Sequence, residues 1–244
     1  MKTVSMDEAA QPPLVEAEDR SGIRILRLCR PPVNALDLAL AGEVLHAIEK
    51  AREDPQCEGV ILTGIPGVFS AGIDTREVPA YGAAKHAEML RTINRLVLAL
   101  YGFPKPVVAA ISGHMLGGAF ILALACDARL AAQGTFRLGL TEAEAAIPFP
   151  AGPLAIVRAE LSPAQIRVLA LGALSAGPDA AIFAGILDRV VEPAELVEAA
   201  MREALRLVAL PGFGRVKRQL RADTVELLAR IVEHDEEPLL EGWV

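Results

Sequence analysis

The sequence is poor in aromatic residues and in cysteine. Aromatic side chains make up 4% of the 244 residues while hydrophobic residues make up 52%, so the core must be mainly aliphatic. Charged residues account for 23%, and this composition excludes a mainly disordered chain. The three cysteines (Cys29, Cys57 and Cys126) are widely spaced without a CxxC pair, which argues against a disulfide framework or a zinc knuckle. We therefore expect one cytoplasmic domain with reduced thiols, with room for a small appendage.

The chain also lacks an excess of positive charge and a signal peptide. Its net charge of -7 argues against nucleic acid or an anionic membrane as a partner. No apolar stretch of the kind found in signal peptides follows the N-terminus. Residues 106–126 carry no charge and reach the length of a membrane span, but glycines and His114 interrupt them. We interpret this run as a buried strand at 107–111, a glycine loop and a buried helix at 118–126.

Motifs for the common cofactors and metals are absent as well. Gly113, Gly117 and Gly118 match neither the GxGxxG nucleotide fingerprint nor a Walker loop, and no GxSxG elbow occurs. The four histidines show no HExxH or other metal-ligand spacing. We therefore expect neither a protein-bound metal nor a separate cofactor.

Hydrophobic periodicity predicts helices that alternate with short strands, which is typical of the α/β class. The expected strands are 23–28, 60–63, 107–111, 128–131 and 187–191. The expected helices are 37–53, 83–101, 118–126, 154–159, 163–171, 179–184, 193–210, 216–220 and 224–234. Residues 4–18 are expected to begin as a frayed tail, and 64–79 and 135–152 to form loops.

Two glycine-bearing loops that follow buried strands are the candidate functional site. Residues 69–74 (FSAGID) follow the strand at 60–63, and residues 113–118 (GHMLGG) follow the strand at 107–111. Glycine allows close approach of the backbone to a ligand, and the first N–H groups of a helix have no internal partner. Two such N–H groups that converge on one oxygen would form an oxyanion hole. From the spacing alone, two tight turns with a structural role remain the simpler interpretation.

Four ordered segments resemble motifs of the crotonase (enoyl-CoA hydratase/isomerase) superfamily. Residues 32–36 (PVNAL) resemble its PPVNAL, 69–74 its FxAGxD, 104–118 (PKPVVAAISGHMLGG) its PKPVIAAVNGxAxGG, and 125–127 its ACD. The similarity extends over about Leu14 to Leu220. It implies a spiral of ββα units over residues 1–190. It also implies a C-terminal helical region, 191–244, that drives assembly into a homotrimer or a dimer of trimers.

The same resemblance implies an acyl-CoA thioester as substrate, so that coenzyme A arrives as part of the substrate. At the matching positions, the N–H groups of Ile73 and Gly118 would form the oxyanion hole, and Ala71 would meet the adenine of CoA. The other substrate-binding candidates in these motifs are Gly72, Asp74, Gly117 and Ile121. Within this set we expect Asp74, like Asp127, to hold its loop through backbone hydrogen bonds.

The acidic residues depart from the pattern of the hydratases in this superfamily. Hydratases carry a Glu three residues after the oxyanion glycine, where this chain has Ile121, and a second Glu that Glu142 matches. Addition of water is best served by two carboxylates, and isoleucine cannot replace one of them. The segment 139–142 (GLTE) is similar to the GLNE segment of mitochondrial-type 3,2-enoyl-CoA isomerases, which retain only this one Glu.

One carboxylate suffices to move a double bond. It can remove the C2 proton of a 3-enoyl thioester, let two N–H groups stabilise the dienolate, and return the proton at C4. We therefore predict an enoyl-CoA isomerase with Glu142 as sole acid/base, its pKa raised by the apolar neighbours Phe120 and Ile121. Glu144 is the competitor, and it would face away in an extended segment. A hydratase or other enolate-stabilising enzyme, or a catalytically weak acyl-CoA-binding homologue, stays an alternative.

Two further features have competing interpretations. Lys217 and Arg218 fit either contacts with the CoA phosphates or, as we prefer, a solvated basic face of a helix. An apolar stripe is typical of a core helix, although part of it could line the pocket for the acyl tail; it consists of Leu90, Ile93, Leu96 and Val97.

Overall fold

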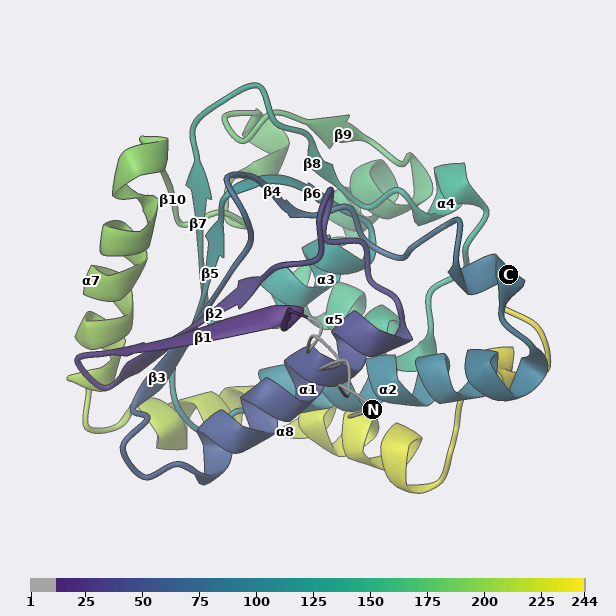
Figure 1. The fold of residues 1–244 in the computed structure, drawn as a ribbon, viewed down its shortest axis with the longest axis horizontal. Coiled ribbons are helices and arrows are strands. Elements are labelled where there is room, and N and C mark those ends of the chain that lie inside the picture. The colour runs from purple at the N-terminus through teal and green to yellow at the C-terminus, as the bar shows by residue number, and fades with distance from the viewer. Residues whose placement is uncertain (1–11, 244) are drawn as a thin grey trace, which may run out of the picture.

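A computed structural model describes residues 12–243 as a six-stranded sheet, a smaller four-stranded sheet and the helices around them (Figure 1). The larger sheet has the order β1-β2-β3-β5-β7-β10. Its strands are β1 (Val15–Arg20), β2 (Ile23–Leu28), β3 (Gly59–Thr63), β5 (Val107–Ile111), β7 (Ala128–Ala132) and β10 (Arg189–Val191). The pair β1 and β2 is antiparallel and all other neighbours are parallel, with Ile25 opposite Ile61.

The larger sheet is covered on both faces, which explains the nearly continuous apolar runs of its central strands. One face packs against α7 (Leu196–Val208), whose small residues include Ala199 and Ala204. The other face shares one apolar cluster with α1 (Leu38–Glu53), α2 (Ala83–Tyr101) and α3 (Gly118–Leu124). In Figure 1, α7 accordingly stands apart from α1 and α2 across the sheet.

The smaller sheet was not expected from the sequence. Its order is β4-β6-β8-β9, formed by β4 (Gly67–Ser70), β6 (Gly113–Leu116), β8 (Leu138–Gly139) and β9 (Ser175–Ala176). The predicted loop at 64–79, the loop-rich segment at 135–152 and the glycine loop beginning at 113 therefore each contain a short strand that the sequence did not predict. Strands of two to four residues are too short to show the alternating pattern that identifies a strand. In chain order β3-β4-α2 and then β5-β6-α3 form successive ββα units, and the predicted α/β class is confirmed.

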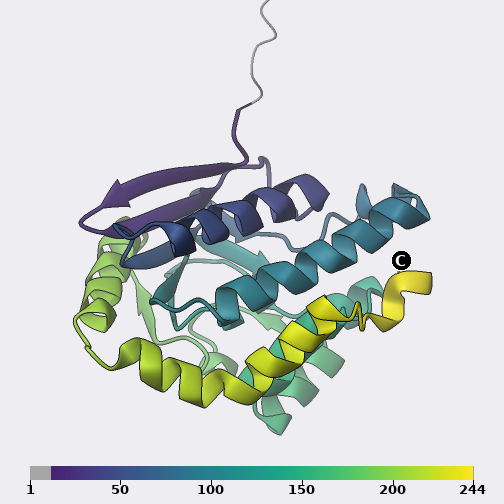
Figure 2. The same ribbon diagram turned by 90° about the horizontal axis from the view of Figure 1, so that it is seen from below.

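Shorter helices follow the last ββα unit. They are α4 (Glu142–Ala145), α5 (Ala151–Glu160), α6 (Pro163–Gln165), the π-helical turn η2 (Ile166–Leu171), and the 3-10 turns η3 (Ala181–Phe183) and η4 (Pro193–Glu195). A further 3-10 turn, η1 (Val78–Ala80), precedes α2. The helices expected at 216–220 and 224–234 are one continuous helix, α8 (Phe213–Glu233), which runs beside α2 (Figure 2). The turn η5 (Pro238–Glu241) then leads to Trp243.

The beginning of the described chain leads into a strand of the larger sheet, and the boundary between the two predicted regions falls in another. The segment 4–18 was expected to start with a frayed tail; residues 4–11 lie outside the described residues, and its later part enters β1 (Val15–Arg20). The boundary between the predicted regions 1–190 and 191–244 falls within β10 and stays a prediction. From residue 12 to residue 243, no helix is both long enough and apolar enough to cross a membrane.

Candidate active site

The two glycine loops lie side by side because β4 pairs in parallel with β6. Gly72 has a φ of +79°. A Cβ atom at Gly72 would clash with the carbonyl oxygen of Leu116 and would lie 3.1 Å from the amide nitrogen of Gly118. Gly117 adopts a φ of 53° and a ψ of -127° immediately before α3. Glycine at these two positions therefore allows one loop to touch the start of the α3 helix.

The N–H groups of Ile73 and Gly118 have no hydrogen-bond acceptor among residues 12–243. Leu36 bonds to both neighbours of Ile73: its N–H donates to the Gly72 carbonyl (2.7 Å), and its carbonyl accepts from the Asp74 N–H (2.9 Å). The Ile73 N–H is thereby left over, while Gly118 is the first residue of α3, where no preceding turn can accept its hydrogen bond. Two unpaired donors on adjacent loops are what an oxyanion hole requires.

Arg30 stabilises the glycine loop at 69–74 through contacts with its last residue and with neighbouring segments. Its guanidinium donates to the Asp74 carboxylate (2.9 Å), the Glu77 carboxylate (3.0 Å) and the Ala35 carbonyl (3.1 Å). Asp74 also accepts from the backbone N–H groups of Arg76 and Glu77. Burial alone would raise the pKa of Asp74, but these hydrogen bonds outweigh it and the pKa is lowered. Asp74 therefore faces its own loop and Arg30, in the structural role expected for it.

Glu142 is the first residue of α4, and its side chain is buried next to the second glycine loop. The residue is 9% exposed, and a Cβ atom on Gly117 would lie 3.4 Å from Glu142 Oε1. Its Oε2 is buried and has no hydrogen-bond partner among the described residues. Desolvation raises the pKa of Glu142 to about 7, against the opposing effect of the Glu142 and Thr141 backbone N–H groups. Such a carboxyl can both take and give a proton near neutral pH.

The main predicted site residues line one common cavity. Ile73, Gly118, Ile121 and Glu142 all line it. Of the apolar stripe on α2, three residues also line the cavity and Leu90 does not; the three are Ile93, Leu96 and Val97. The remaining candidates belong to the loops beside the cavity and not to its lining, namely Ala71, Gly72, Asp74 and Gly117.

Glu144, the competing acid, is exposed and does not line this cavity. The reason given for setting it aside was wrong, because Glu142 and Glu144 lie on the helical turn α4 and not in an extended segment. Sequence reasoning also missed two parts of the cavity wall, the segment around Pro148 and the side chain of Trp243. No local pattern points to either, since both reach the site only through packing.

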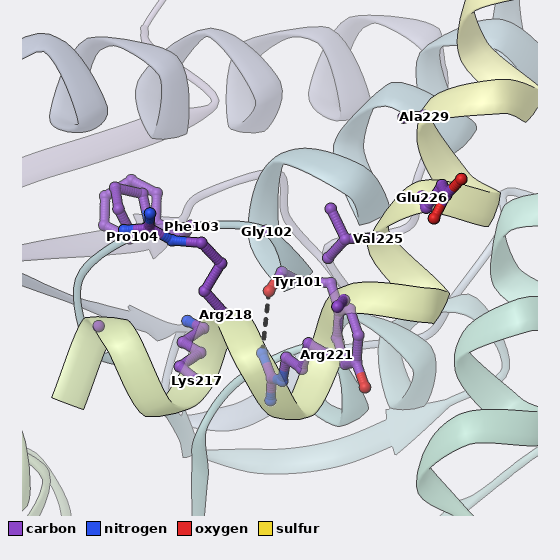
Figure 3. A pocket seen from close by; sticks show the side chains of 12 residues that line it. Tyr101, Gly102, Phe103, Pro104, Lys217, Arg218, Arg221, Val225, Glu226 and Ala229 are labelled. Carbon is purple, nitrogen blue, oxygen red and sulfur yellow. Dashed lines mark hydrogen bonds between the residues drawn. The ribbon is translucent and has the colours of Figure 1, made fainter. Parts of the chain in front are cut away.

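A second cavity, of about 420 Å³, lies between the end of α2 and helix α8 (Figure 3). It is lined by Tyr101, Arg218 and Arg221, among others, and Arg221 donates a hydrogen bond to the Tyr101 carbonyl (3.1 Å). None of its lining residues belongs to the two glycine loops at 69–74 and 113–118, and Glu142 does not line it either. This cavity is therefore separate from the candidate active site.

Lys217, which also lines the second cavity, does not belong to a solvated basic face. It is 8% exposed, and its Nζ lies 2.7 Å from Asp127 Oδ2. Asp127 also accepts from the Val107 N–H (2.8 Å) and pairs with Arg221 (3.1 Å), so it ties α8 to the start of β5. Burial lowers the pKa of Lys217 despite this partner. The prediction of a solvated face is thus wrong for Lys217, whereas Arg218 is exposed.

The part of the chain that the structure describes contains no group of three or more His, Cys, Asp or Glu side chains that could hold a metal ion. The cavity itself brings together one buried carboxyl, two backbone N–H donors and an apolar wall. This combination suits proton transfer next to a carbonyl oxygen that becomes negatively charged.

Comparisons with known proteins identify a family and several similar chains. Residues 18–238 match the family described as Enoyl-CoA hydratase/isomerase. The chain is 33% identical over 228 residues to mouse mitochondrial enoyl-CoA delta isomerase 1, covering 91% of this chain and 78% of that protein. It is 32% identical over 192 residues to a probable enoyl-CoA hydratase of Mycobacterium tuberculosis, covering 78% and 73%. The crystal structure of human mitochondrial delta3-delta2-enoyl-CoA isomerase matches with a TM-score of 0.84 and 30% identity, covering 91% and 89%.

The ββα units and the similarity to a solved enoyl-CoA isomerase define an enzyme with the crotonase fold. The chain belongs to the enoyl-CoA hydratase/isomerase family. Its relatives include both isomerases and hydratases, so the reaction has to be argued from the residues of the site.

Proposed function

We propose that this protein converts a 3-enoyl-CoA into the 2-enoyl-CoA, with Glu142 as the only acid/base. The observation that carries the proposal is the composition of the cavity. Glu142 is the one ionisable residue in its described lining, and Ile121 stands where a second carboxylate would be needed for hydration.

The proposed reaction moves one proton and one double bond. The thioester oxygen accepts hydrogen bonds from the N–H groups of Ile73 and Gly118, and the Glu142 carboxylate removes a proton from C2. The electron pair of the broken C–H bond first forms a C1–C2 double bond, and the carbonyl π pair moves onto the thioester oxygen. When the carbonyl is restored, the C1–C2 pair becomes the C2–C3 double bond and the former C3–C4 pair takes the proton from Glu142 at C4. Between these steps the negative charge rests on the thioester oxygen, where the two N–H donors stabilise the dienolate. Glu142 is regenerated as the carboxylate, so the reaction needs no cofactor.

The raised pKa of Glu142 supports this role. A carboxyl group with an ordinary pKa near 4.5 would be a weak base for a carbon acid and would rarely be protonated at neutral pH. With a pKa of about 7, the same group is available in both forms. A cavity wall without other charges is what produces this shift.

Hydration of a 2-enoyl-CoA is the second candidate function. It is supported by the similarity to a probable hydratase over 192 residues. In that case Glu142 and a substrate group would have to hold the water, because Ile121 can neither orient nor activate it. Binding of acyl-CoA without either reaction would instead indicate a catalytically weak homologue.

The experiment compares the wild-type protein with Glu142→Gln, on a 3-enoyl-CoA for isomerisation and on crotonyl-CoA for hydration. The matched control is Glu144→Gln, which changes an exposed acid two residues away. We expect isomerisation by wild type and Glu144→Gln, and a loss of about 10²-fold to 10⁴-fold in Glu142→Gln. Equal rates for all three proteins would refute the assignment. Hydration faster than isomerisation would favour the second candidate.

We also infer that copies of the chain assemble, as a homotrimer or a dimer of trimers. Support comes from large apolar side chains on α8 that are open to solvent in one chain, with Val216 51% and Leu220 81% exposed. Analytical ultracentrifugation tests this inference, since a monomer at micromolar concentration would contradict it. A cytoplasmic location stays a prediction.

A further inference from the structure

Trp243, which lies beyond the last long helix, is part of the wall of the active-site cavity. Trp243 lines the same cavity as Glu142 and is only 5% exposed. Its indole Nε1–H donates to the Pro148 carbonyl oxygen (2.9 Å). Pro148 also lines the cavity, so this hydrogen bond fixes the indole at the wall.

The segment that carries Trp243 is anchored through a buried carboxylate. Glu237 is 5% exposed, and its Oε2 accepts from Asn94 Nδ2 (2.9 Å) and from the Ala151 N–H (2.7 Å). Its Oε1 accepts from the Leu239 N–H (3.0 Å). Asn94 lies on α2 between the cavity-lining residues Ile93 and Leu96, and its Oδ1 accepts from the Gly152 N–H (2.9 Å). These bonds hold the segment in a fixed position relative to the cavity.

The cavity is small for an acyl chain. It offers about 30 Å³ to a molecule of the size of water, which is on the order of one or two waters. The length of acyl chain that the cavity accepts therefore depends on which side chains of its wall can move. Leu96, Val97 and Ile121 are at most 2% exposed and belong to the main core cluster, so moving them would disturb the packing of α2 and α3. Trp243 belongs to the same core cluster, but it lies outside regular secondary structure, so moving it would not displace a helix.

We propose that Trp243 is the residue that determines acyl-chain specificity, and that its indole forms the wall against which the acyl chain ends. This inference rests on the proposed function, because it takes the cavity next to Glu142 as the acyl pocket. A smaller side chain at position 243 would lengthen the pocket. The preference would then shift toward longer chains, because each further buried methylene adds to binding.

The first test uses the fact that Trp243 is the only tryptophan of the chain. Its fluorescence in the wild-type protein is recorded during titration with free CoA and with saturated acyl-CoAs of increasing length. We expect a change in emission that grows with acyl length and is small with free CoA. The same response to free CoA as to every acyl-CoA would overturn the inference.

The second test compares Trp243→Ala and Trp243→Phe with Leu240→Ala. Leu240 lies on the same segment and packs against the core without lining the cavity, so its truncation reports general loosening. Dissociation constants for saturated acyl-CoAs and kcat/KM for 3-enoyl-CoAs are measured across chain lengths. We expect Trp243→Ala to shift the preference for long over short chains by about tenfold or more, Trp243→Phe by less, and Leu240→Ala not at all.

The outcomes separate this inference from the proposed function. An unchanged length profile in Trp243→Ala, or an equal shift in Leu240→Ala, would overturn the role of Trp243 while leaving the isomerase intact. Absence of isomerisation at every chain length would refute the proposed function alone. In that case the dissociation constants and the fluorescence titration still decide whether Trp243 limits the acyl chain. Thermal melting of each variant shows that the comparison is made between folded proteins.

Discussion

Replacement of Glu142 by glutamine tests whether the protein sacrifices stability to bury a catalytic carboxylate. Burial raises the pKa of Glu142 from its ordinary value of 4.5 to about 7. At about 1.4 kcal/mol for each pH unit, this shift means that ionised Glu142 destabilises the folded state by about 3 kcal/mol. Glutamine has the same shape and stays neutral at every pH, so the variant does not carry this cost.

The sign of the effect depends on pH. Below about pH 4.5 the carboxyl is neutral in the folded and the unfolded chain, and it contributes no ionisation cost. As the pH rises through 7, the unfolded chain is already ionised and the folded one becomes so, and the stabilisation of the neutral form is lost. Glu142→Gln should therefore gain about 3 kcal/mol over wild type between about pH 4.5 and pH 8. Any fixed cost of burying the amide is the same at both pH values and cancels.

Urea denaturation followed by the fluorescence of Trp243 measures this difference, with Glu144→Gln as the control for a change in net charge. A gain that is the same at every pH would refute the claim that burial perturbs Glu142. Activity gives an independent reading. The kcat/KM of the wild type should rise with pH through about 7, because only the carboxylate can take the C2 proton. A profile that is flat across this range would contradict the assignment of Glu142 as the base.

Three further substitutions test other parts of the structure. Ile121→Glu adds a second carboxylate to the cavity and should raise hydration of crotonyl-CoA above the wild-type level, whereas a similar gain with Ile121→Gln would contradict the two-carboxylate argument. Gly72→Ala forces Leu116 and Gly118 away from the loop that carries Ile73 and should lower the isomerisation rate by about 10²-fold to 10³-fold, so an unaltered rate would speak against the oxyanion hole. Asp127→Ala leaves Lys217 buried with no carboxylate partner among the described residues and should lower the free energy of unfolding by about 3–5 kcal/mol in urea, whereas a loss below about 1 kcal/mol would show that the pair is not important.

Much of the larger sheet and of the long helices could be predicted because their signals are local. The strands at 60–63 and 107–111 are uninterrupted apolar runs, and the helix at 83–101 has regularly spaced apolar residues that end before Pro104. The break expected between 220 and 224 does not occur, and residues 221–223 lie inside α8. Arginine and alanine are good helix formers, so these residues do not interrupt the helix.

The candidate site was predictable to the extent that its motifs are contiguous. The glycine loops and Glu142 could be named because the resemblance rests on short ordered segments. The structure added what those segments cannot contain, namely that Leu36 occupies both neighbours of Ile73 and so leaves its N–H unpaired. It also reversed the interpretation of Lys217, because nothing near residue 217 in the sequence reveals that Asp127 lies beside it.

The sequence by itself determined the α/β class, the positions of the two glycine loops and the replacement of a carboxylate by Ile121. These properties depend on residue types and on short spacings, and both can be read from a short segment of the sequence. Only the tertiary structure decided that Glu142 is desolvated, that Trp243 lines its cavity and that Glu237 anchors the segment that carries Trp243. Burial and the lining of a cavity depend on side chains brought together from distant parts of the chain. A carboxylate becomes a base for neutral pH only when such packing removes it from water.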